Sequence, residues 1–124
     1  MKITPSASNK AGFNLAELLA RVENDRELLR ELLSIFKQEF PTHFQDLREA
    51  VARQDAAGVA AASHALKGML ANLAIAGAAK GAAHLEKVAR SGEIDSLKPA
   101  FATLEEQVRG LLQEMDTYMG ETRS

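Results

Sequence analysis

The chain of 124 residues carries a net charge of −2 and contains no cysteine. This length suits one domain, and so weak a charge gives no reason to expect nucleic acid or an anionic membrane as a partner. Disulfides and thiolate chemistry are excluded. No apolar run approaches the roughly 20 residues of a membrane span, and the polar start lacks the apolar centre of a secretory signal. We expect a cytoplasmic monomer that does not insert into a membrane.

The predicted elements begin after a flexible lead-in at residues 1–12. Asn14 can cap a short first helix that ends near residues 22–24, with Glu17 completing a capping box. Asp25 can cap a second helix. Its apolar residues recur at helical spacing and include Leu28, Leu29, Leu32, Ile35, Phe36 and Phe40. Pro41 removes a backbone donor, and because the apolar pattern resumes after it, we expect one long helix that is kinked there.

Three further helices complete the prediction. Asp55 caps the third, which should break near residues 74–77, and a fourth covers about residues 78–90. Asp95 or Ser96 starts the last helix, Pro99 is tolerated in its first turn, and residues 120–124 should fray. No stretch alternates apolar and polar residues as a strand does. The pattern therefore predicts an all-α domain at residues 13–119: an antiparallel four-helix bundle with a short additional N-terminal helix.

The third helix has an unusual outward face. At roughly 100° per residue, Leu66 lies on an apolar stripe that must face the core, and His64 falls about 160° away from it. The neighbours of His64 on that side are small and nearly uncharged. They are Ala57, Ala60, Ala61, Gly68 and Ala71, with Lys67 and Asn72 at the edges. Because a solvent-facing helix side is normally charged, we interpret this face as a low surface on which another protein can approach the histidine.

Other kinds of site find little support. The sequence has no glycine-rich phosphate loop, and its three histidines, His43, His64 and His84, do not share metal-ligand spacing. We therefore expect no metal and no cofactor of the chain's own. Glycine in mid-helix costs roughly 1 kcal/mol relative to alanine, so Gly68 suggests that something passes close over the backbone there.

The segment His64-Ala65-Leu66-Lys67-Gly68 resembles the HxLKG signature of histidine-containing phosphotransfer (HPt) domains, which act in bacterial multistep phosphorelays. The similarity continues without a gap through residues 72–73 and 85–86 to residues 89–92. Upstream, the pattern from Asp25 to Asp55 also resembles the family. The resemblance covers nearly the whole chain, from residue 13 to about residue 115.

The resemblance implies a function. His64 would accept a phosphoryl group on Nε2 from the aspartyl phosphate of a receiver domain and pass it to another receiver. Lys67 would offset the phosphoryl charge, Gly68 would leave room, and the alanine face would accept the receiver's docking helix. The receiver would supply the Mg²⁺. The chain would then be a phosphoryl carrier rather than an enzyme, with response-regulator receivers or a hybrid sensor histidine kinase as partners and no nucleic acid.

Two alternatives stay open. The chain could be an HPt-like, P1-type domain of a chemotaxis kinase, phosphorylated from ATP on the same His64 by a separate catalytic domain. It could also be a helical bundle that only binds partners and is not phosphorylated, which would leave His64 without a chemical role.

Overall fold

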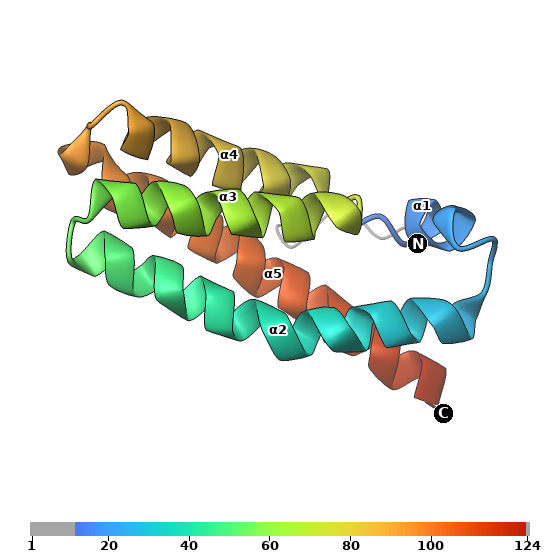
Figure 1. The fold of residues 1–124 in the computed structure, drawn as a ribbon. Coiled ribbons are helices and arrows are strands. Elements are labelled where there is room, and N and C mark those ends of the chain that lie inside the picture. The colour runs from blue at the N-terminus through green and yellow to red at the C-terminus, as the bar shows by residue number, and fades with distance from the viewer. Residues whose placement is uncertain (1–11, 124) are drawn as a thin grey trace, which may run out of the picture.

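The computed structural model describes residues 12–123, and this part of the chain is built from helices without a strand. The α-helices are Leu15–Arg21 (α1), Arg26–Ala52 (α2), Ala56–Asn72 (α3), Ala76–Arg90 (α4) and Leu97–Arg123 (α5), and a 3-10 turn at Ile94–Ser96 (η2) precedes α5. Figure 1 shows α2 to α5 packed as an antiparallel bundle, with α1 at one end. The predicted all-α fold is confirmed, including the short additional N-terminal helix.

Side-chain caps begin three of the helices, as predicted. In each case a side-chain oxygen accepts a hydrogen bond from the backbone N–H three residues later, which satisfies a donor that has no partner inside the helix. The pairs are Asn14 with Glu17, Asp25 with Leu28 and Asp55 with Gly58, each at 3.0 Å. Such a cap stabilises a helix by about 1 kcal/mol.

The helix α2 passes through Pro41 as one continuous element, and its ribbon changes direction about midway (Figure 1). The apolar residues of α2 recur at helical spacing as predicted, but not all of them are buried: Leu28, Leu32 and Ile35 have exposed fractions of 39%, 37% and 50%. These three lie about 100° around the helix from the line of leucines and phenylalanines that reaches the core. The apolar surface of α2 is thus wider than the face its neighbours cover.

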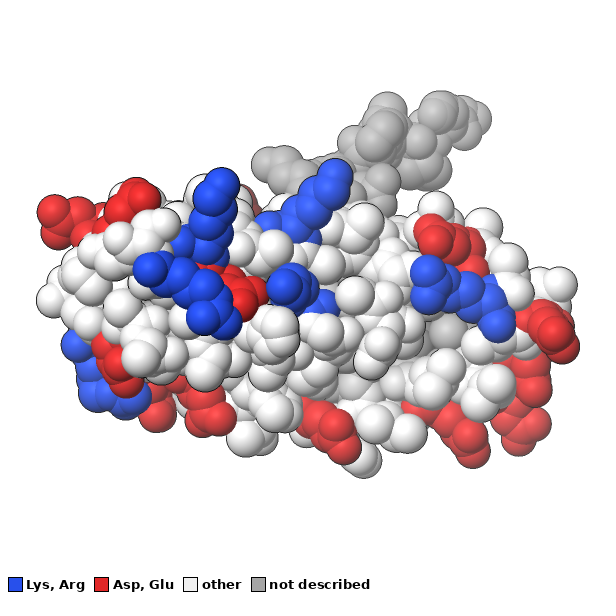
Figure 2. Space-filling model, turned by 45° about the horizontal axis from the view of Figure 1, so that its top comes forward, with Lys and Arg blue, Asp and Glu red and all other residues white. Residues whose placement is uncertain are grey.

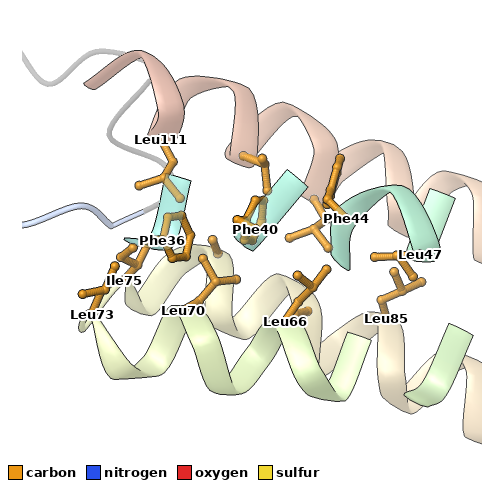
Figure 3. Packing of buried hydrophobic residues seen from close by; sticks show 14 of the residues in the cluster. Phe36, Phe40, Phe44, Leu47, Leu66, Leu70, Leu73, Ile75, Leu85 and Leu111 are labelled. Carbon is orange, nitrogen blue, oxygen red and sulfur yellow. The ribbon is translucent and has the colours of Figure 1, made fainter. Parts of the chain in front are cut away.

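Aromatic rings fill the core between α2 and α5. Phe40 stacks on Phe36 and on Phe44 with ring centroids 4.7 Å and 5.6 Å apart, and Phe44 stacks on Phe101 of α5 at 5.3 Å. Figure 3 shows the rings of α2 in the space between α3 and α5, beside buried leucines. Burial of these large side chains accounts for much of the bundle's stability.

The connections differ in detail from the prediction. The break after α3 is a tight turn at residues 73–75, in which Ala74 has a positive φ of 55°, so α4 begins at Ala76 rather than near residue 78. Pro99 lies in the first turn of α5, as predicted. This helix runs to Arg123, through most of the segment at 120–124 that the sequence predicts to fray.

The start of the described chain rests on α4. Gly12 has a φ of +83°, and a Cβ there would lie 2.6 Å from the backbone nitrogen of Gly77, so the close approach requires glycine. The rest of the predicted lead-in, residues 1–11, lies outside the described residues. Among residues 12–123, no helix is both long enough and apolar enough to cross a membrane.

Candidate functional site

The imidazole of His64 stands on the outward side of α3, as predicted, and its side chain is 63% exposed. Its neighbour Ser63, about 100° around the helix, is buried. The Ser63 hydroxyl is fully buried and donates a hydrogen bond of 2.6 Å to the carbonyl of Val59. With Leu66 and Leu70 also buried, the orientation of α3 follows the predicted apolar stripe.

The small-residue face around His64 is exposed as predicted at most positions, namely Ala57, Ala61, Gly68, Ala71 and Asn72. The expectation for Ala60 is wrong, because this residue is only 6% exposed. The alanine-rich α4 packs close beside α3 and covers it. Ala60 instead lines a shallow hollow between the two helices, together with Ala89 and Arg90 of α4. The outward face is therefore narrower on the α4 side than the sequence indicates.

A carboxylate from α4 lies against the imidazole. Glu86, whose side chain is 10% exposed, places Oε2 3.2 Å from Nδ1 of His64. Its Oε1 lies 3.2 Å from Nζ of Lys67. Arg90, one turn further along α4, donates to Oε2 from Nε at 3.0 Å and from Nη2 at 2.7 Å. Figure 2 shows basic side chains gathered over α3 and α4, beside a largely uncharged surface.

This cluster keeps Glu86 ionised. The hydrogen bonds from Arg90 are the largest cause, and with Lys67 and His64 they outweigh the effect of burial and lower the pKa of Glu86 to about 2. A negatively charged acceptor beside Nδ1 favours the tautomer in which Nδ1 carries the proton. The lone pair of Nε2 is then free for chemistry at the exposed edge of the ring.

Lys67 and Gly68 occupy the turn after His64, and their surroundings differ from each other. The ammonium of Lys67 contacts Oε1 of Glu86, the carboxylate that also faces His64, rather than being free in solvent. Within residues 12–123, a Cβ on Gly68 would meet no atom within 4 Å, so no packing among these residues requires glycine there. By contrast, a Cβ on Gly81 would lie 2.5 Å from Oε1 of Gln107. Open space over Gly68 fits the predicted role in steric clearance.

Sequence reasoning did not assign Glu86 to the site. It lies at the border of the core, about 70° around α4 from the side that Ala82, Leu85 and Ala89 bury. Arg90 follows it four positions later. A lone carboxylate at the edge of an alanine-rich apolar stripe, with an arginine at that spacing, was the signal that could have found it. His43 and His84 are exposed. Over residues 12–123, no three histidine, cysteine or acidic side chains gather as a metal site.

Comparison with known proteins gives one result for this chain. A family model described as "Hpt domain" matches residues 31–118. This span includes all of α3 and α4, and therefore every residue of the cluster around His64. No curated protein and no solved structure matches the chain.

Proposed function

The chain belongs to the histidine-containing phosphotransfer (Hpt) domain family, whose members are phosphocarrier modules of phosphorelays, and we propose that His64 is its phosphoryl acceptor. One observation carries the proposal most directly. The imidazole is exposed, and its Nδ1 is held by an ionised carboxylate, so Nε2 is the ring nitrogen left for an incoming group. His64 combines this geometry with the small-residue surroundings that a partner would need.

The proposed donor is the aspartyl phosphate of a receiver domain. The lone pair of Nε2 attacks phosphorus, the N–P bond forms, and the P–O bond to the aspartate breaks to leave its carboxylate. Because Nδ1 keeps its proton, the ring gains a positive charge during the transfer. Glu86, 3.2 Å from Nδ1, would stabilise that charge as the aspartate does in a Ser-His-Asp triad. The reverse reaction would hand the phosphoryl group to a second receiver.

The charges of the cluster suit an incoming phosphoryl group. Lys67 and Arg90 contribute two positive charges and Glu86 one negative charge, so these three side chains leave a single positive charge beside the imidazole. Phosphoryl transfer depends mainly on positioning and on stabilising negative oxygen atoms, which cationic side chains provide. Lys67, one turn from His64, would contact the phosphoryl oxygens. The Mg²⁺ would be supplied by the receiver.

The exposed small residues would form the docking surface. Ala57, Ala61 and Ala71 lie around His64 and leave the imidazole as the most prominent group on this face. A receiver domain could then bring its aspartyl phosphate close to Nε2 without displacing bulky side chains. We propose receivers of response regulators or of a hybrid sensor kinase as the partners, and no catalytic role for the chain beyond carrying the group.

The proposal is tested by incubating the chain with phosphorylated receiver domains and Mg²⁺. We expect an acid-labile, base-stable label that His64→Gln abolishes, while His43→Gln and His84→Gln retain it. A label that survives in the His64 variant would contradict the assignment. Labelling by ATP and a separate kinase domain, with no receiver able to donate, would instead favour the chemotaxis-kinase alternative. Absence of label from either source would favour a binding module.

A further inference from the structure

The two carboxylate oxygens of Glu86 contact different side chains. Oε2 receives both hydrogen bonds from Arg90 and also faces Nδ1 of His64 at 3.2 Å. Oε1 carries the contact to Nζ of Lys67 at 3.2 Å. The oxygen that orients the imidazole is thus the one that Arg90 anchors, whereas Lys67 uses the other.

Arg90 and Lys67 bind the carboxylate of Glu86 with different geometry. Arg90 approaches Oε2 with two donors of its planar guanidinium, at 3.0 Å and 2.7 Å, from the same helix as Glu86. Lys67 makes one contact at the end of a flexible stem, from the opposite helix. A guanidinium fork loses less conformational freedom per hydrogen bond than an ammonium does. Of the two, Lys67 is therefore the one that can leave Glu86 for a new anion.

We propose that Arg90 is a positioning residue, which holds Glu86 against Nδ1 of His64 while Lys67 moves from Glu86 to the phosphoryl group. This inference rests on the proposed function. It gives the two cations separate roles: Lys67 contacts the phosphoryl oxygens, and Arg90 acts through Glu86 on the ring. Without Arg90, the departure of Lys67 would leave a carboxylate that only the imidazole holds, at the moment when the ring must stay aligned.

The first test needs no phosphoryl group. The ¹⁵N signals of the His64 ring report which nitrogen carries the proton. We expect the Nδ1–H tautomer to predominate in the wild type, to lose that predominance in Arg90→Gln, and to keep it in Lys67→Gln. Arg90→Lys retains the charge but not the fork, so it should give an intermediate result. Arg21→Gln is the matched control, because it removes another arginine–glutamate pair at i,i+4 spacing, from α1.

The second test follows the phosphorylated domain. Phosphoramidate, a small donor that acts without a receiver, should label Arg90→Gln about tenfold more slowly than the wild type, a loss typical of removing a partner that orients a histidine. Lys67→Gln should chiefly shorten the lifetime of the phosphohistidine. The separate roles would be overturned if the His64 ring signals of Arg90→Gln matched those of the wild type. They would also be overturned if Arg90→Gln and Lys67→Gln changed the labelling rate and the phosphohistidine lifetime equally. Failure to label His64 by any donor would contradict the proposed function, and the tautomer measurement would still decide the role of Arg90.

Discussion

The two halves of the bundle pack by different means. Between α2 and α5 the contacts are large rings, Phe36, Phe40, Phe44 and Phe101. Between α3 and α4 no aromatic ring is buried, and the buried residues include four alanines, Ala60, Ala78, Ala82 and Ala89. Small side chains let two helices approach closely. This approach brings Oε2 of Glu86 within 3.2 Å of Nδ1 of His64 on the neighbouring helix. Bulky packing on one side supplies stability, and small residues on the other permit a site made by two helices.

The largest effect on stability should come from the aromatic side. Phe40 is 1% exposed and stacks on two other rings, so Phe40→Ala leaves a cavity and should lower the free energy of unfolding by about 3–5 kcal/mol. Urea unfolding followed by circular dichroism measures this loss. At low temperature, where the variant stays folded, phosphorylation of His64 should persist. A loss below about 1 kcal/mol would show that the aromatic side does not dominate stability.

A smaller effect is expected from the carboxylate in the cluster. Since the pKa of Glu86 is lowered in the folded state from 4.5 to about 2, its ionisation stabilises the fold above pH 4.5, and this contribution is lost as the pH falls towards 2. Over this window the wild type should lose about 2 kcal/mol more than Glu86→Gln, allowing for the solvent around its partners. Urea unfolding at several pH values measures the difference.

Glu105→Gln is the control for this acid dependence. Glu105 pairs with Arg48 at 2.8 Å on the α2–α5 side and is more exposed than Glu86, so its removal should alter the pH profile less. Equal profiles for the wild type and Glu86→Gln would contradict the assignment of an ionised Glu86 to the cluster.

Substitutions of Gly68 should change the rate of phosphoryl transfer without lowering the stability of the fold. Because a Cβ there would meet no atom of the described residues within 4 Å, Gly68→Ala should stabilise the domain by up to about 1 kcal/mol. Gly68→Gln should fold as well as the wild type but should slow transfer from a receiver. Gly81→Ala is the control, since its Cβ would lie 3.3 Å from Cδ1 of Leu104, and it should gain less. If Gly68→Gln unfolds the domain, steric clearance is the wrong explanation.

The smallest change in stability should come from the exposed alanines. Ala61→Arg and Ala71→Arg add bulk and charge outside the core, so their free energies of unfolding should stay within about 0.5 kcal/mol of the wild type. Binding to a receiver, measured by calorimetry, should nevertheless weaken. Ala102→Arg, at an exposed position on α5, should leave both quantities unchanged. Unaltered binding in the first two variants would exclude this face as the docking surface.

The sequence predicted those features that local signals determine. The caps at Asn14, Asp25 and Asp55 and the outward position of His64 follow from spacing within single segments. The burial of Ala60 depends on how closely α4 packs against α3, which no segment encodes alone. The exposure of the apolar residues on α2 likewise depends on how far its neighbours extend. The role of Glu86 could not be predicted because it depends on how α4 is placed against α3, which carries His64 and Lys67.

The orientation of Ser63 has a consequence for the fate of the phosphoryl group. A serine hydroxyl next to a phosphohistidine could capture the group as a phosphate ester, which is far less reactive than an N–P bond and would end the relay at this domain. Here the hydroxyl is buried on the core side of α3, where it donates to the carbonyl of Val59, whereas the imidazole is exposed. This burial would keep the adjacent nucleophile out of reach, and a phosphoryl group on His64 would then be retained in the form that the next acceptor can remove.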